Sequence, residues 1–159
     1  MKENKTTNNE ILQLVSFSLD KEEFGVDISA VHEINRMTEI TKLPGSPDFV
    51  EGIINLRGKV VPVISLRKRL GMAKKGIDKD SRVIVVELEG NTIGFIVDAV
   101  NEVLRIDSST TEAPPAIFYF GMRSDYIKSL AKLEDRILIL LNIENVLTGL
   151  EVFEVVEEI

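Results

Sequence analysis

Cysteine is absent from this sequence of 159 residues, and histidine occurs only once, as His32. Without cysteine the chain can form no disulfide and offers no thiolate for catalysis or metal binding. A single histidine is too little for the usual zinc sites, which combine several His and Cys ligands. Its place between Val31 and Glu33 favours a solvated turn residue over a general base or ligand. We therefore expect neither a metal nor a cofactor.

Long apolar runs and an excess of positive charge are missing as well. No apolar stretch approaches the roughly 18 residues of a membrane span. The polar N-terminus, MKENKTTNNE, lacks the apolar core of a secretion signal. The net charge of −7 disfavours a nucleic-acid binder, which needs a basic face. We expect a soluble, cytoplasmic protein without a nucleic-acid partner or membrane insertion.

Catalytic motifs are equally scarce. The sequence contains no glycine-rich phosphate loop, nucleophile elbow or kinase signature. Asp27 and Asp98 lie at nearby but non-equivalent positions of two similar stretches, residues 24–34 and 93–103, so symmetry does not make them an acid pair. The sequence predicts a protein that is not an enzyme. An enzyme that uses Asp27 or Asp98 and a small-molecule-binding β-barrel sensor are the alternatives.

The most informative stretch is FVEGIINLRGKVVPVISLRKRLG, residues 49–71. Two β-rich runs separated by a short break with a glycine predict a hairpin, with Gly58 in the turn and Arg57 at or beside its tip. Pro62 cannot donate to a strand ladder, so the second strand is either an edge or turns its amide side away from a neighbour. Ser65 is placed to cap a short helix.

The same pattern returns later in the chain. Residues 126–147, YIKSLAKLEDRILILLNIENVL, align with residues 49–70 at an offset of 77. Residues 93–103, IGFIVDAVNEV, align with residues 24–34, FGVDISAVHEI, at an offset of 69. Two consistent offsets indicate a structural duplication. A chance likeness between short hairpins is the competing explanation.

Many short strands with only short helices between them predict an all-β fold of small-barrel type. We expect a disordered tail at residues 1–10, a first β module at 11–75 and a second at 76–147. The polar stretch MAKKGIDKDS, residues 72–81, connects the modules. The apolar spacing of Val152, Val155, Val156 and Ile159 makes a helix an option for the C-terminal segment, residues 148–159.

These motifs resemble one known family, the CheW coupling proteins of bacterial chemotaxis. The resemblance extends from about Leu12 to Leu147, and four segments carry it: residues 24–34, 47–71, 93–106 and 125–147. Ser65 departs from the family pattern, which usually has Asp before Leu-Arg, but serine caps helices equally well. The family also resembles the C-terminal domain of the CheA histidine kinase, but this chain lacks the kinase segments.

The resemblance implies two five-stranded SH3-like β barrels, packed on a shared hydrophobic core as one CheW-like domain, and no catalysis. It further implies an adaptor that couples methyl-accepting chemotaxis receptors to the regulatory domain of CheA, at receptor arrays on the membrane. The positions matching the family's receptor contact are Val31, Glu33, Ile34, Gly52 and Arg57. Those matching its kinase contacts are Val83 and Val100, with Ile117 and Phe118 in a second contact that closes rings of kinase and adaptor.

Each of these residues also has a plain structural explanation. Arg57 fits an ordinary turn arginine, because arginine is common on surfaces. Val31 and Ile34 fit core packing. The apolar run Ile117–Phe120 fits a lid folded over a barrel end as well as it fits a contact surface.

Overall fold

The computed structural model describes residues 10–115 and 124–147, and strands predominate in it. The elements are, in order, β1 (Ile11–Leu19), β2 (Glu22–Asp27), η2 (Ile28–Ala30), β3 (Val31–Arg36), β4 (Val50–Leu56), β5 (Lys59–Ser65), α1 (Leu66–Arg69), β6 (Arg82–Leu88), β7 (Asn91–Val97), β8 (Ala99–Asp107), η3 (Ser108–Thr110), β9 (Thr111–Glu112), η5 (Ser124–Tyr126), β10 (Ile127–Lys132), β11 (Ile137–Leu141) and α2 (Ile143–Leu147). The predicted β class with short helices is confirmed. The predictions for residues 1–9 of the N-terminal tail and for the C-terminal segment fall outside the described residues, whereas Glu10, the last residue of the predicted tail, accepts a hydrogen bond from the Ser108 amide at 2.8 Å.

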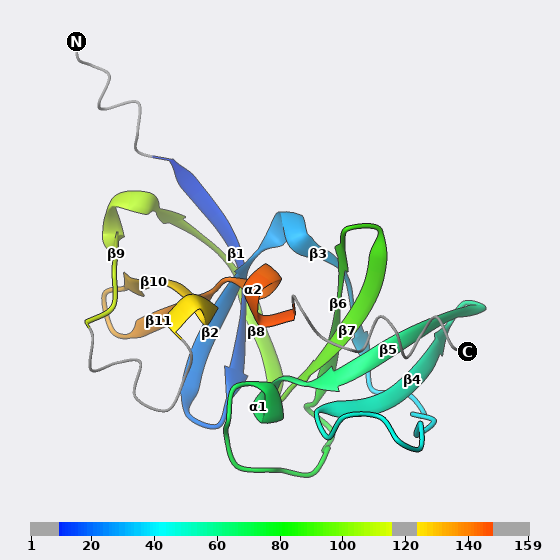
Figure 1. The fold of residues 1–159 in the computed structure, drawn as a ribbon. Helices are drawn as coiled ribbons and strands as arrows, with labels where there is room; N and C mark the ends of the chain where they lie inside the picture. Colours follow the sequence, from blue (N-terminus) through cyan, green and yellow to red (C-terminus); the bar gives the residue numbers. More distant parts are fainter. Residues whose placement is uncertain (1–9, 116–123, 148–159) are drawn as a thin grey trace.

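The strands form two sheets. Sheet A has the order β8-β1-β2-β11-β10-β9, and sheet B has the order β3-β6-β7-β5-β4. Figure 1 shows β9, β10 and β11 on the left and the hairpins β6–β7 and β4–β5 on the right. Each sheet takes strands from both sides of the expected module boundary at residues 75 and 76. The sequence modules 11–75 and 76–147 are therefore not the two sheets.

The internal repeat explains this exchange. The offsets of 69 and 77 make the following strands equivalent: β1 and β6, β2 and β7, β3 and β8, β4 and β10, β5 and β11. When each strand of β8-β1-β2-β11-β10 in sheet A is replaced by its equivalent, the result is β3-β6-β7-β5-β4, which is the order of sheet B. Each half thus contributes its first two strands to one sheet and its later strands to the other. The duplication inferred from two offsets is present in the strand order.

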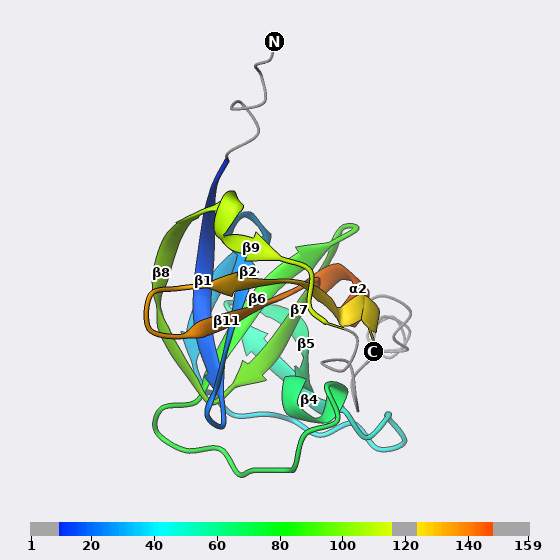
Figure 2. The same cartoon turned by 90° about the vertical axis from the view of Figure 1, so that its left-hand side faces the viewer.

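The strand registers repeat too. In sheet A the parallel pairing of β2 with β11 places Gly25 opposite Leu140, and in sheet B the pairing of β7 with β5 places Gly94 opposite Val63. These are equivalent pairs, because Gly94 follows Gly25 by 69 residues and Leu140 follows Val63 by 77. In Figure 2, β10 and β11 cross β1 and β2 steeply. This agrees with a β2–β11 register of only two residue pairs.

The largest hydrophobic cluster is shared by both sheets. It joins Phe17 and Phe24 of sheet A to Phe95 and Ile64 of sheet B, all of them 0–1% exposed. The Phe17 ring lies 5.7 Å from Phe24 and 5.9 Å from Phe95, within the range of favourable aromatic pairs. Two smaller clusters line the individual sheets. The shared core holds the two sheets together.

The predicted hairpin is β4–β5. Arg57 and Gly58 form its turn with φ angles of 52° and 87°, and two successive positive φ values suit a tight hairpin. The Ser65 side chain caps α1 by accepting a hydrogen bond from the Lys68 amide at 3.2 Å. β5 is not an edge strand, since it lies between β7 and β4. Pro62 is tolerated because the pairing of β5 with β7 begins only at Val63.

Candidate functional site

Glu33 and Arg57 meet across a corner of sheet B. Glu33 lies on β3, Arg57 lies at the tip of hairpin β4–β5, and the Arg57 guanidinium donates to the Glu33 carboxylate at 2.5 Å. β3 and β4 are the two opposite edges of sheet B. The sheet must curl for this pair to form, which is the curvature of a small barrel. Two residues that the family resemblance assigns to one receptor contact are therefore in contact with each other.

The corner formed by Glu33 and Arg57 contains one ion pair and is open to solvent. The hydrogen bond from Arg57 holds the pKa of Glu33 below its usual value. The Arg57 side chain is 70% exposed and that of Glu33 is 22% exposed. Below the tip, the Asn55 side chain accepts the Gly58 amide at 2.7 Å and fixes the turn. An exposed guanidinium with five N–H donors and one bound carboxylate can still bind another acceptor.

The other predicted receptor-contact residues differ in exposure. Ile34 follows Glu33 on β3 and is 39% exposed, which is unusual for a large apolar side chain. Val31 is half-buried and packs against the shared core. Gly52 is buried in β4. Ile34, Glu33 and Arg57 can meet a partner directly, whereas Gly52 is buried and offers a partner little surface.

The predicted kinase-contact residues also divide. Val83 is 0% exposed in the core of sheet B, so its side chain is not available to a partner. Its assignment to the kinase contact, which rests on family position, stays a prediction, and in this structure the side chain contributes to core packing. Val100 is half-buried on β8 and lies against the shared core. Ile117 and Phe118 lie outside the described residues.

A second corner, in sheet A, was not predicted from the sequence. Arg136, in the turn of hairpin β10–β11, donates to Glu23 on β2 at 2.7 Å and to Glu102 on β8 at 3.1 Å. Glu102 is the repeat equivalent of Glu33, and Arg136 is the equivalent of Lys59. The repeated glutamate is visible in the alignment of residues 24–34 with 93–103, and it is the signal that could have pointed to this corner. Its arginine is only 36% exposed, because three carboxylates surround it.

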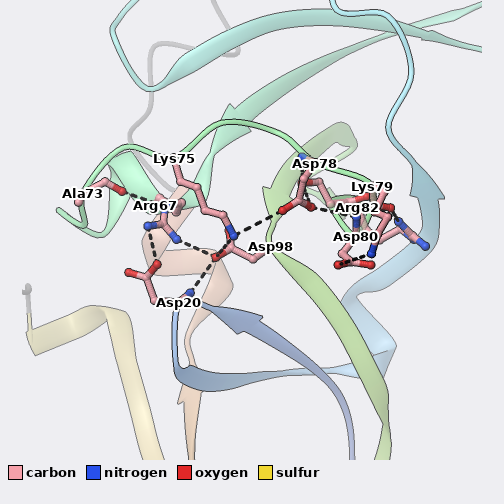
Figure 3. A network of polar contacts seen from close by, with 10 residues as sticks. Asp20, Arg67, Ala73, Lys75, Asp78, Lys79, Asp80, Arg82 and Asp98 are labelled. Carbon is pink, nitrogen blue, oxygen red and sulfur yellow. Dashed lines mark hydrogen bonds and ion pairs between the residues drawn. The ribbon is translucent and has the colours of Figure 1, made fainter.

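A buried arginine joins the two sheets at another point. Arg67 of α1 is 7% exposed, and its guanidinium donates to Asp20 at 2.7 Å, to Asp98 at 2.8 Å and to the Ala73 carbonyl at 2.8 Å. Figure 3 shows these groups converging from the β1–β2 turn, the β7–β8 junction and the chain segment after α1, with Lys75 beside Asp98. The cluster therefore fastens sheet A to the end of sheet B.

Neither aspartate considered for catalysis has a catalytic arrangement. Asp98 is neutralised by Arg67 and Lys75, and Asp27 accepts the Ser29 amide at 2.8 Å as the cap of η2. Hydrogen bonds from the Ser29 backbone and side chain lower the pKa of Asp27. Among residues 10–115 and 124–147, no three His, Asp or Glu side chains are grouped to hold a metal ion. Within the same residues, no helix is long and apolar enough to cross a membrane.

Comparison with known proteins identifies relatives over most of the chain. The family model described as the CheW-like domain matches residues 13–151. The chemotaxis protein CheW of Klebsiella aerogenes is 34% identical over 139 residues, 87% of this chain and 83% of its own length. The CheW of Thermotoga maritima is 33% identical over 142 residues, 89% of this chain and 91% of its own length. The crystal structure of the scaffolding protein TtCheW from Thermoanaerobacter tengcongensis has a TM-score of 0.80 at 43% identity, covering 87% of this chain and 94% of that one.

Proposed function

This chain belongs to the CheW-like domain family, and from that membership we propose that it is a non-enzymatic adaptor of bacterial chemotaxis, which couples methyl-accepting chemotaxis receptors to the CheA histidine kinase. The observation that carries the proposal is the family match over residues 13–151, together with relatives that are named chemotaxis or scaffolding proteins. Those relatives align over most of their own length.

The proposed receptor contact is the sheet B corner, with Glu33, Ile34 and Arg57 at its surface and Val31 beside them. An exposed apolar side chain next to a guanidinium suits an amphipathic helix that carries an acceptor group. The guanidinium fixes the orientation of such a helix through charge-assisted hydrogen bonds. Support comes from the 2.5 Å contact that brings Glu33 and Arg57 together.

The proposed kinase contact uses Val100, and Ile117 with Phe118 form the second contact that closes rings of kinase and adaptor. Val100 keeps part of its side chain exposed on β8, which suits an apolar contact. A lysine at Val100 should weaken kinase binding, since it places a charge in that contact. A serine at Ile117 should leave kinase binding intact and disturb higher-order assembly.

The rival functions receive no support from the site. A sensor for a small molecule needs a largely apolar pocket with a few convergent polar groups. The hollow beside α1 is instead lined by charged side chains that already pair with each other, among them Arg67, Lys68 and Asp98. We place the adaptor in the cytoplasm, recruited to receptor arrays at the membrane.

A pull-down with two purified partners tests the proposal. The chain should bind the regulatory domain of CheA and, separately, the hairpin tip of a chemotaxis receptor. Mixed with both, it should raise kinase activity above that of the kinase with either component alone. A well-folded chain that binds neither partner refutes the adaptor function.

A further inference from the structure

Gly52 is enclosed by the chain itself. It is buried in β4, with a φ of 145° that side-chain-bearing L-residues rarely adopt. A Cβ added at Gly52 would lie 2.2 Å from the backbone oxygen of Thr41 and 2.7 Å from the side chain of Ile40. A backbone oxygen cannot turn aside as a flexible side chain can. The glycine is therefore required by the segment that lies over it.

That segment is the connection from β3 to β4. Thr41 and Ile53 form an isolated antiparallel bridge, with the Thr41 amide donating to Ile53 at 2.9 Å and the Ile53 amide donating to Thr41 at 2.8 Å. Because Ile53 follows Gly52, the bridge can form only where the chain comes this close to β4. Absence of a side chain at Gly52 permits that approach.

The bridge helps to close sheet B. β3 and β4 are opposite edges of the sheet and do not pair with each other. The Thr41–Ile53 bridge holds the chain that leaves β3 against β4, and the Glu33–Arg57 ion pair joins β3 to the far end of hairpin β4–β5. The bridge and the ion pair thus both hold the edge strands β3 and β4 close to each other, which keeps sheet B curled.

Sheet A closes with similar parts but without a glycine. β9, which follows β8, pairs with β10 through Thr111 and Ala131, and the Arg136–Glu102 ion pair joins β8 to hairpin β10–β11. Ser129 stands there at the repeat position of Gly52. A glycine is therefore needed only in sheet B, where the backbone of Thr41 lies against β4.

We infer that Gly52 is a positioning residue for receptor docking: it makes no contact with the partner, but lets the 37–49 connection close sheet B and so brings Glu33 and Arg57 into one docking corner. The inference rests on the proposed function for its partner. It replaces the direct contact that the family position suggested, since a buried glycine offers a partner no surface.

Two variants disrupt the contact between β4 and the 37–49 connection, one by a change in each segment. Gly52→Ala introduces the clash with Thr41, whereas Thr41→Pro leaves β4 unchanged and removes the amide that donates to Ile53. Gly90→Ala is the matched control, because Gly90 also has a positive φ, 81°, but a Cβ there meets nothing within 4 Å. Circular dichroism verifies that each variant is folded.

The first measurement is the titration of the Glu33 carboxyl by NMR, which needs no partner. Opening the corner separates Glu33 from Arg57, so the pKa of Glu33 should rise toward its ordinary value in Gly52→Ala and Thr41→Pro and stay low in Gly90→Ala. An unchanged Glu33 titration in folded Gly52→Ala and Thr41→Pro overturns the inference.

The second measurement is the affinity for a receptor hairpin-tip fragment. If the closed corner falls to about a tenth of the population, both variants should bind about tenfold more weakly. Both should bind the CheA regulatory domain like the parent. Weak binding by Gly52→Ala with parental binding by Thr41→Pro would show a direct contact at Gly52 and overturn the inference. A parent chain that binds no receptor fragment refutes the proposed function instead, while the Glu33 titration still reports on the closure.

Discussion

Arg69 donates a hydrogen bond from its Nε to the backbone oxygen of Val146, 2.8 Å away, and Val146 is the residue that the internal repeat places at the position of Arg69. Two equivalent positions can touch only near the axis that relates the two halves. The guanidinium also lies 5.1 Å from the ring centre of Phe49 and 5.6 Å from that of Tyr126, which are themselves equivalent. One arginine thus binds both halves where they meet.

Replacing Arg69 with methionine should lower the free energy of unfolding by about 2 kcal/mol, from two cation–π contacts and one charged hydrogen bond. Arg69→Lys should lose less, because it keeps the charge. Arg105→Met, on the exposed face of β8, is the control and should stay within about 0.5 kcal/mol of the parent. Urea unfolding measures all three, and equal midpoints for Arg69→Met and the control would contradict the prediction.

Arg57→Glu should remain folded and lose at most about 1 kcal/mol of stability, because the Arg57 side chain is 70% exposed and the ion pair to Glu33 that the variant breaks lies at the surface. It should still lose receptor-dependent activation of the kinase, since losing an interfacial arginine can cost about 2 kcal/mol or more in binding. Lys21→Glu makes the same charge change at the exposed β1–β2 turn and should remain active. Thermal melts test the predicted stability, and a reconstituted receptor–kinase assay tests the predicted loss of activation. A variant that melts normally and still activates the kinase fully would show that Arg57 is only a turn residue.

Arg67→Met should destabilise the fold by about 3 kcal/mol or more, because it removes the closer of the two cations that pair with Asp98, whose side chain is only 13% exposed, and leaves the longer contact to Lys75. Asp20→Asn should cost about 1 kcal/mol at most, since the Asp20 side chain is 49% exposed. Glu89→Gln is the control: Glu89 occupies the equivalent turn, with a φ of 52° against 56° for Asp20. Chemical unfolding should rank the losses as Arg67→Met, Asp20→Asn, Glu89→Gln, and any other order would contradict the assigned role of Arg67.

Val83→Lys should unfold the chain or cost about 3 kcal/mol or more, because it buries a charge in the core of sheet B. Val103→Lys is the control, since Val103 is also a strand valine but is 55% exposed. Lost kinase binding in Val83→Lys would therefore reflect lost folding. A cooperative melt at the parental temperature would show instead that this position reaches the surface.

The folded state should become less stable in acid, because four of its carboxylates have lowered pKa values. Hydrogen bonds lower the pKa of Asp27, Glu33, Asp78 and Asp107, chiefly from Ser29, Arg57, Asp80 and Ser109 respectively. The folded state then binds fewer protons than the unfolded state, so its stability is full above the ordinary pKa values of 3.8 and 4.5 and declines as pH falls through the lowered ones. Melting temperatures measured across this range should show a shallower decline in the double variant Asp27→Asn, Asp107→Asn.

Local features followed from the sequence because their causes are local. The β4–β5 turn was predicted from Gly58, and the start of α1 from Ser65. The repeat places Asn142 at the position of Ser65, and Asn142 caps α2 by accepting the Asn145 amide at 3.0 Å. Each depends on neighbours within a few residues.

Other features depend on contacts far apart in the chain. The repeat shows which strands are equivalent but not with which copy they pair, so the sharing of each sheet by both halves was not predicted. Gly52 matched a family contact position, yet its burial depends on Thr41, and no sequence pattern placed Thr41 over β4. Val83 could not be separated from a surface valine, because alternation in a strand does not say which face is covered.

The sharing of strands also bears on how this molecule is made and how it arose. During synthesis, the first half leaves the ribosome with hairpins β1–β2 and β4–β5 but without a complete sheet, so a native sheet must wait for the second half. Two copies of a smaller ancestor that traded strands across a twofold axis would have had this architecture before their genes were joined. The connection at residues 72–81 would then mark the site of fusion, and Arg69 would still hold the place where two separate subunits once met.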